Sequence, residues 1–196
     1  DAADILPEDT VVEIGAGLGF VTEQLVKIAK KVVAIELDED MVRELKKIPA
    51  NNLQIVHADI LKTDLSQFGD NIKIVANIPY YITTPIITKF IDEGYIPEQM
   101  VLMVQKEVGE RLSASVGNSD YGAITAILNY FFDIEYLFTV DRNEFYPMPN
   151  VDSAIIKFTK KDTLLECDYE KFKMLVMDAF KQKRKNLKNN LKKYNL

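Results

Sequence analysis

Residues 10–29, TVVEIGAGLGFVTEQLVKIA, combine an apolar run, a glycine-rich turn and an amphipathic segment. Thr10–Ile14 predicts a short strand, and helical spacing begins directly after the turn, at Val21, Leu25, Ile28 and Ala29. Glycines in the turn, residues 15–19, let the backbone approach a ligand closely, and the helix start offers free N–H groups. This strand–turn–helix unit therefore predicts an α/β fold, with a ligand site where the strand ends. The alternative is a glycine turn that binds nothing.

Further apolar runs alternate with helical patterns along the rest of the chain. The predicted strands are Val32–Leu37, Leu53–Ala58, Ile72–Ile78, Met100–Val104, Ile134–Val140 and Ala154–Phe158. The predicted helices are Glu39–Lys47, Thr84–Ile91, Lys106–Ala114 and Ala123–Phe132. This alternation predicts a mostly parallel sheet with helices on both faces. The last two strands are joined without a helix, so we expect the final strand to be antiparallel to its neighbour.

Composition limits the classes of protein and site that this chain can form. It has 196 residues, of which 47% are hydrophobic, enough for one sizeable core. No run of about 18 apolar residues predicts a membrane span, so we expect no membrane partner. Cys167 and His57 are the only residues of their types, which argues against a disulfide, a zinc site and a Cys–His dyad. We therefore expect no metal, and a reducing, cytoplasmic location.

Charge is unevenly distributed between the body of the chain and its C-terminal end. Residues 171–196 hold nine Lys or Arg and one acid, Asp178, so they carry +8 and leave −14 on the first 170 residues. A basic segment on an acidic body predicts a polyanionic partner for that end, and a solvated helix face is the alternative. We expect a boundary at Lys160–Asp168, followed by a helix that docks through one apolar stripe: Phe172, Leu175, Val176, Ala179 and Phe180.

Residues 74–81, IVANIPYY, form an apolar strand that ends abruptly at Pro79. Proline has no amide hydrogen and restricts Ile78 to extended conformations, so the strand cannot continue in a central ladder. The carbonyl before Pro79 and the amide of Asn77 are two acceptors beside the ring of Tyr80. Such a set could hold a planar amine such as that of adenine, guanine or glutamine. The alternative is a plain strand end with Tyr80 in the core.

Acids accompany the first three strands. Glu36 follows Gly15 by 21 residues, a spacing at which an acid accepts hydrogen bonds from ribose hydroxyls of NAD or another adenosine ligand. Asp59 follows the third strand, and Glu13 lies inside the first. The turn reads G-x-G-x-G instead of the dinucleotide pattern G-x-G-x-x-G. Because these acids would repel a pyrophosphate but suit a sulfonium and an ammonium, they favour S-adenosylmethionine. The alternative for Glu36 and Asp59 is helix capping or a solvated turn.

The chain resembles the rRNA adenine dimethyltransferase family, the KsgA-type enzymes, over nearly its whole length. The matching segments, in the family's order, are VVEIGAGLGFVTEQL (11–25), VVAIELD (32–38), HADIL (57–61), NIPYYITTPII (77–87), LMVQKEVGERL (102–112), SDYGAI (119–124) and FYPMPNVDSAI (145–155). The resemblance implies a Rossmann-like S-adenosylmethionine-dependent methyltransferase fold. Its seven-stranded sheet would be mostly parallel with the last strand antiparallel, and the start of a small helical domain would follow. It also implies dimethylation of the exocyclic amine of adenines in small-subunit rRNA during ribosome biogenesis.

Carried over residue by residue, the resemblance also implies a set of site residues. Cofactor-binding residues would be Glu13, Gly15, Ala16, Gly17, Glu36, Leu37, Asp59, Ile60 and Asn77. Catalytic residues would be Asn77, Ile78, Pro79 and Tyr80, and Tyr80 and Phe145 would stack on the target base. Core packing is the alternative for Phe145. The basic segment AFKQKRKNLKNNL (179–191) resembles the family's helical domain. Because the acidic body attracts a phosphate backbone poorly, we expect RNA contacts from the cations of this segment: Lys181, Lys183, Arg184, Lys185 and Lys188. The alternative is that these charges only solvate the helix.

Domain organisation follows from the same resemblance. We expect a catalytic domain at 1–160, without the family's N-terminal segment that contains a Q-x-F-L motif, and a basic helical region at 161–196 that is cut short. We expect the protein to be monomeric and to act on rRNA in a small-subunit precursor particle. Two other functions remain open. One is methylation of large-subunit rRNA of the antibiotic-resistance type, and the other is a non-catalytic ribosome-assembly or transcription factor.

Overall fold

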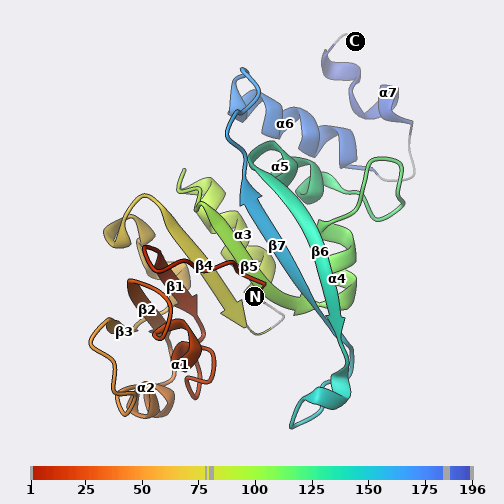
Figure 1. The fold of residues 1–196 in the computed structure, drawn as a ribbon. Helices are drawn as coiled ribbons and strands as arrows, with labels where there is room; N and C mark the ends of the chain where they lie inside the picture. The colour runs from red at the N-terminus through yellow and green to blue at the C-terminus, as the bar shows by residue number, and fades with distance from the viewer. Residues whose placement is uncertain (1, 78, 80–81, 183–185, 195–196) are drawn as a thin grey trace.

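Seven strands form one continuous sheet at the centre of the protein (Figure 1). The computed structural model describes residues 2–77, 79, 82–182 and 186–194. The strands are β1 (Thr10–Ile14), β2 (Lys31–Glu36), β3 (Leu53–His57), β4 (Ile72–Asn77), β5 (Gln99–Gln105), β6 (Phe132–Val140) and β7 (Ser153–Lys160). Their order across the sheet is β3-β2-β1-β4-β5-β7-β6. All pairs are parallel except those of β7, which is antiparallel to both β5 and β6, as the short connection before it predicts.

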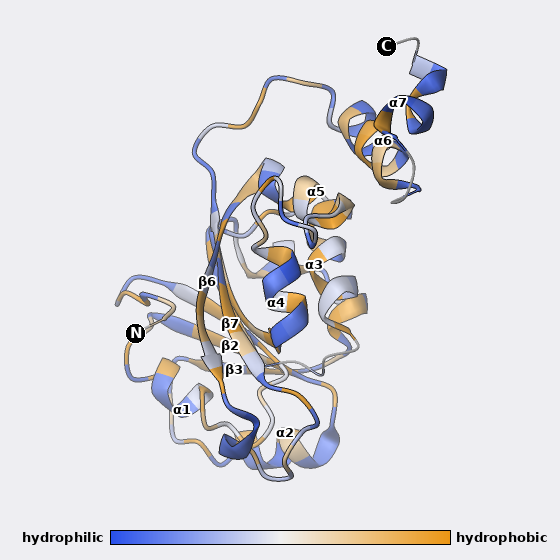
Figure 2. Ribbon diagram, turned by 90° about the vertical axis from the view of Figure 1, so that its right-hand side faces the viewer, coloured by the Kyte–Doolittle hydropathy of each residue, from blue (hydrophilic) through white to orange (hydrophobic). Residues whose placement is uncertain are grey.

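Helices cover both faces of the sheet (Figures 1 and 2). They are α1 (Thr22–Leu25), α2 (Glu39–Leu45), α3 (Thr83–Asp92), α4 (Lys106–Leu112), α5 (Ala123–Phe131), α6 (Tyr169–Phe180) and α7 (Leu187–Asn190). Short 3-10 turns lie at η1 (Ile60–Lys62), η2 (Leu65–Phe68), η4 (Arg142–Glu144) and η5 (Lys192–Tyr194). The helices α1, α2 and α4 are shorter than the apolar spacing predicts. Among the described residues, no helix is both long and apolar enough to cross a membrane.

The main core lies on the face covered by α3, α4 and α5. Alternate strand residues such as Val12, Val33 and Ile74 point to this face and are completely buried against the helices. Their neighbours Val11 and Val32 point to the other face, where they pack with residues of α1. Since both sides of the central strands are buried, these strands are apolar without alternation, which is why they are visible in the sequence.

A segment before β1 runs across the uncovered part of the second face (Figure 1). Lys73 of β4 lies 2.8 Å from a carboxylate oxygen of Asp9, and its amine also donates to the carbonyl of Asp4 at 2.9 Å. The amide of Gln99 donates to the carbonyl of Ala3, and Lys157 of β7 pairs with the carboxylate of Asp4 at 2.6 Å. These bonds supply partners for polar side chains that the sheet would otherwise bury alone.

Helix α6 packs on α5 through aromatic rings after a connecting segment at 161–168. The ring of Phe172 lies 5.1 Å from that of Tyr130, and the ring of Tyr169 lies 4.9 Å from that of Phe131. The predicted apolar stripe of α6 faces this aromatic cluster. Its residues there are buried Val176 and half-buried Phe172, Leu175 and Ala179. Phe180, the last residue of the stripe, is more exposed and lies near Tyr121.

Candidate active site

A pocket of about 540 Å³ opens at the carboxyl ends of the first parallel strands. The residues that line it are Ile14, Gly15, Ile35, Glu36, Leu37, Asp38, Ala58, Asp59, Ile60, Pro79 and Ile82. This is the edge at which open α/β sheets bind ligands. Its described lining includes three carboxylates and no Lys or Arg, a composition that favours a cationic ligand over a pyrophosphate.

The glycine turn closes one end of this pocket. The amide of Gly15 donates to the carbonyl of Ile35 at 2.9 Å, which holds the turn against the end of β2. Gly15 and Gly17 have φ angles of +71° and +55°, a left-handed conformation in which side chains other than glycine are strained. The chain thus turns sharply after β1, and Ala16 is nearly buried within the turn.

Three backbone amides converge on the carboxylate of Glu36 at the end of β2. One oxygen accepts from the amides of Leu37 and Asp38 at 2.7 and 2.9 Å, and the other accepts from Gly17 at 2.8 Å. A carboxylate has about four lone-pair sites, so one site remains, on the oxygen that faces Gly17. Glu36 therefore fixes the glycine turn to β2 and still offers an acceptor in the pocket.

Asp59 has a structural bond as well as a place in the lining. It is the N-cap of η1, where one carboxylate oxygen accepts from the amide of Leu61 at 2.9 Å. The second oxygen is 3.7 Å from the amine of the exposed Lys62, a weak surface pair that leaves it available to a ligand. The capping alternative for Asp59 is thus correct, and it does not exclude a ligand role because the two oxygens differ in their partners.

Glu13 lies behind the glycine turn, with 3% of its surface exposed. Burial raises the pKa of this carboxyl group to about 7, the hydrogen bond from the Thr22 hydroxyl lowers it, and the nearby charge of Glu36 raises it. Loss of hydration outweighs the hydrogen bonds from Thr22, because they cannot replace all of the water around a carboxylate. A cationic group in the pocket would favour the charged form of Glu13.

Asn77 and Pro79 lie at the carboxyl end of β4, and only Pro79 is among the described lining residues. Asn77 is exposed, pairs with Met103 of β5, and ends the strand as the proline predicts. The carbonyl of Pro79 accepts from the amide of Ile82 at 3.1 Å, which begins the turn into α3. The predicted residues Ile78 and Tyr80 lie outside the described residues.

Comparison with known proteins identifies the family to which the chain belongs. The family described as ribosomal RNA adenine dimethylase matches residues 1–195. The chain belongs to the ribosomal RNA adenine dimethylase family. A curated member from Ligilactobacillus salivarius, named ribosomal RNA small subunit methyltransferase A, is 45% identical over 201 residues. That alignment covers 97% of this chain and 68% of the relative.

Solved structures of related methyltransferases have the same fold as this dimethylase family member. A dimethyladenosine transferase from Plasmodium falciparum is 37% identical with a TM-score of 0.87, covering 97% of this chain and 70% of that one. The 23S rRNA methyltransferase ErmE is 26% identical with a TM-score of 0.81, covering 97% of this chain and 78% of that one. The expected fold class, a seven-stranded α/β methyltransferase sheet, is therefore confirmed, and its antiparallel strand is β7.

The pocket of this dimethylase family member fits S-adenosylmethionine, the methyl donor that methyltransferases of this fold use. Asp59, Ile60 and Glu36 line the pocket, and Gly15 of the glycine turn lies at its end. The fit rests on the lining itself: the carboxylates of Glu36 and Asp59 can accept hydrogen bonds from an adenosine, and an acidic lining favours a positively charged ligand. Among the residues that the structure describes, no cluster of His, Cys, Asp or Glu could hold a metal ion.

The remaining predicted residues lie away from the pocket lining. Phe145 follows η4 in the β6–β7 loop and is half-buried. Lys181 caps the end of α6 and Lys188 lies in α7, both exposed, whereas Lys183, Arg184 and Lys185 fall outside the described part of the chain. The RNA contacts of all five therefore stay a prediction.

Sequence reasoning missed two residues that support this site. Asp38 supplies one of the amides that hold Glu36, and its side chain caps α2 by accepting from the amides of Asp40 and Met41. Thr22 supplies the only described side-chain donor to Glu13. Asp38 could have been found, because an acid directly before a predicted helix is a common N-cap. Thr22 could not have been found, since its partner Glu13 lies nine positions away across the glycine turn.

Proposed function

We propose that this protein transfers methyl groups from S-adenosylmethionine to the exocyclic amine of adenines in small-subunit rRNA, giving dimethyladenine. The observation that carries the proposal is an acid-lined pocket at the ends of β1–β3 that opens beside the turn after Asn77. Membership of the ribosomal RNA adenine dimethylase family supports the reaction. The names of relatives at 45% and 37% identity support the small subunit and dimethyladenosine as the product.

Each binding residue has a proposed role that follows from its place. Asp59 accepts from the adenine amine of the cofactor through the oxygen that is not used in capping. Glu36 accepts from a ribose hydroxyl at its remaining lone pair, next to Gly17. Glu13 compensates positive charge at the methionine end, where Gly15 and the rest of the glycine turn allow close approach.

Transfer needs a better nucleophile than a free adenine amine, because the nitrogen lone pair is delocalised into the ring. When bound, the cofactor supplies an electrophilic methyl group. Asn77 and the carbonyl of Ile78 accept hydrogen bonds from the target amine, which favours a pyramidal nitrogen and stabilises charge that develops in the transition state. Tyr80 and Phe145 stack on the withdrawn base and offset part of the cost of leaving the RNA stack.

We further propose that residues 1–160 act as the catalytic domain and residues 161–196 as a basic region that contacts RNA. The proposed site of action is a small-subunit precursor particle in the cytoplasm, with the protein working as a monomer. Methylation of large-subunit rRNA is the main rival, and ErmE supports it at 26% identity. A purely structural role in ribosome assembly is the other.

Methyl transfer to isolated ribosomal subunits tests the proposal. We expect the wild-type protein to transfer labelled methyl groups to undermethylated small subunits and not to large ones. Asn77→Ala should abolish the transfer and leave most of the cofactor binding, measured by calorimetry. Asn51→Ala, an exposed Asn in the turn before β3, is the matched control and should remain active. Labelling of large subunits, or near-native turnover by Asn77→Ala, would contradict the proposal.

A further inference from the structure

The loop between β6 and β7, residues 141–152, carries a fully exposed aromatic ring. Tyr146 is 103% exposed relative to a free side chain, and Met148 in the same loop is 58% exposed. A tyrosine ring can bury about 150–250 Å² of surface, so this ring is a large unused contact area. No function proposed above uses it.

Tyr146 differs from its neighbour Phe145 in exposure. Phe145 has an extended backbone, with φ −115° and ψ 146°, and in extended chain successive side chains lie on opposite sides. Phe145 is half-buried, whereas Tyr146 is fully exposed. The two rings therefore lie in different surroundings, and a role for Phe145 on the target base leaves Tyr146 for a different group.

Hydrogen bonds at its root hold the loop in place. Asp141 caps η4 by accepting from the amide of Asn143 at 2.8 Å. Arg142 then joins the two arms of the loop. Its amide donates to the carboxylate of Asp152 at 3.2 Å, and its guanidinium donates to the carbonyl of Asn150 at 3.3 Å. The tip is thus presented from a braced base, which lowers the entropy lost when a ligand orders it.

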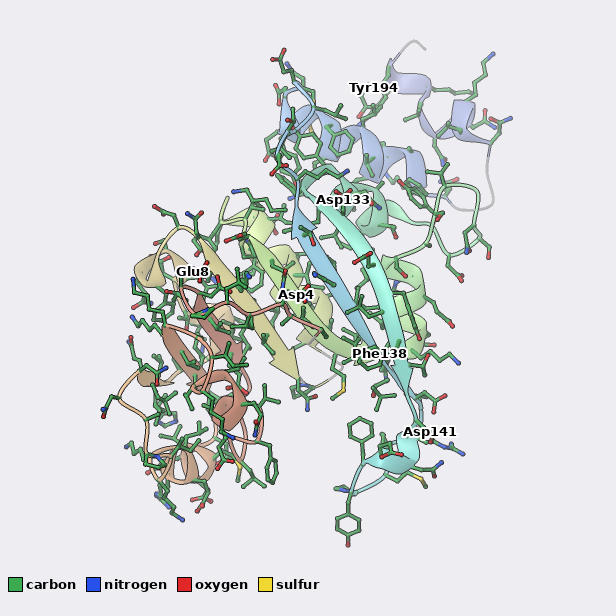
Figure 3. The ribbon with its side chains drawn as sticks, viewed as in Figure 1. Asp4, Glu8, Asp133, Phe138, Asp141 and Tyr194 are labelled. Atoms are coloured by element: carbon green, nitrogen blue, oxygen red, sulfur yellow. The ribbon has the colours of Figure 1, made fainter. Side chains whose placement is uncertain are left out.

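The loop starts at the same edge of the sheet as the proposed reaction centre. Pairing across the sheet runs from Asn77 to Met103, from Met103 to Ile155 and from Ile155 to Phe138, so these residues share one row and one face. Three strand spacings separate Asn77 from Phe138 by about 14 Å. Figure 3 shows Phe138 on β6 and Asp141 beyond the end of that strand, where the loop begins. Nucleotides that flank a base held at Asn77 would pass this loop.

We propose that Tyr146 stacks on a nucleobase next to the target adenine and so holds open the stack from which the target is withdrawn. This role rests on the proposed function. A withdrawn base leaves the faces of its neighbours uncovered, and an exposed tyrosine can cover such a face whatever the base is.

The test uses RNA with 2-aminopurine, an adenine analogue whose fluorescence falls when it stacks, placed on either side of the adenine that the protein methylates. We expect wild-type protein and Tyr146→Phe to change the fluorescence at one flanking position. Tyr146→Ala should lose this change and bind the RNA about 5- to 150-fold more weakly, the equivalent of about 1–3 kcal/mol for one stacked base. Its affinity for S-adenosylmethionine should not change.

Leu165→Ala is the matched control, because Leu165 is also exposed but lies between β7 and α6, at the opposite end of the sheet. It should behave as wild type. Equal fluorescence changes in Tyr146→Ala and wild type would overturn the stacking role while leaving methyl transfer, and hence the proposed function, intact. A lower unfolding temperature in Tyr146→Ala would also overturn it, since the ring would then pack on the protein. If the wild-type protein methylated no rRNA, this result would contradict both the proposed function and the stacking role.

Discussion

Replacing Glu36 with glutamine tests how the pocket is held together. The carboxylate of Glu36 accepts three backbone amides, from Gly17, Leu37 and Asp38. Glutamine keeps the shape of the side chain but has one oxygen and one NH₂ group. Its oxygen can still accept from Leu37 and Asp38, so its NH₂ group must then face the amide of Gly17, donor against donor.

The magnitude follows from these contacts. Two hydrogen bonds change from charge-assisted to neutral, at about 1 kcal/mol each, and the amide of Gly17 loses its partner at about 1–3 kcal/mol. We therefore expect Glu36→Gln to lower the free energy of unfolding by about 3–5 kcal/mol. Affinity for S-adenosylmethionine should fall as well, because the glycine turn is no longer fixed to β2.

Urea denaturation measures the stability change, and calorimetry at low temperature measures binding to the folded fraction. Glu39→Gln is the matched control, because Glu39 is exposed and its ion pair with Arg43 lies at the surface of α2, a contact worth about 0–1 kcal/mol. A loss in Glu36→Gln no larger than that in Glu39→Gln would refute the reasoning, since the three amides would then contribute little.

Three further predictions address the cofactor, pH and RNA. Asp59→Ala should weaken S-adenosylmethionine binding by about 1–3 kcal/mol in calorimetry. Asp59→Asn is a second variant, which keeps the N-cap of η1. Unchanged affinity in both variants would show that Asp59 does not bind the cofactor. Burial raises the pKa of Glu13 from 4.5 to about 7, so the native state keeps a proton that the unfolded chain releases. Stability should therefore fall by about 3 kcal/mol as pH rises from about 4.5 to about 7, and urea denaturation of Glu13→Gln should lack this slope. Replacing Lys183, Arg184 and Lys185 together with Gln should flatten the salt dependence of RNA affinity by about two to three units in filter binding; an unchanged slope would move the RNA contact to the catalytic face.

The sequence predicted the strands well because burial on both faces makes them continuous apolar runs. Val11, Val32 and Ile74 are completely buried, and the segments around them were recognised within a residue or two of their observed limits. The antiparallel last strand also followed from its short connection. The order of the strands across the sheet could not be predicted, because hydrophobic patterns are local and do not show which strands pair.

Partners of polar residues were the harder part of the site. Glu36 was predicted at a strand end, but its bond to Gly17 depends on how the turn folds back over β2. Lys73 is a charged residue in a buried strand, and its partner Asp9 comes from a segment that crosses the sheet. Such contacts join parts of the chain that are distant in sequence, so periodicity carries no signal for them.

Nucleoside analysis of the methylated RNA tests the central claim most directly. Undermethylated small subunits would be incubated with the protein and S-adenosylmethionine, and their rRNA digested and analysed by mass spectrometry. The proposed function predicts dimethyladenosine in small-subunit rRNA, formed by wild-type protein and absent with Asn77→Ala. Methylation of a different base, of a ribose hydroxyl or only of large-subunit rRNA would contradict it.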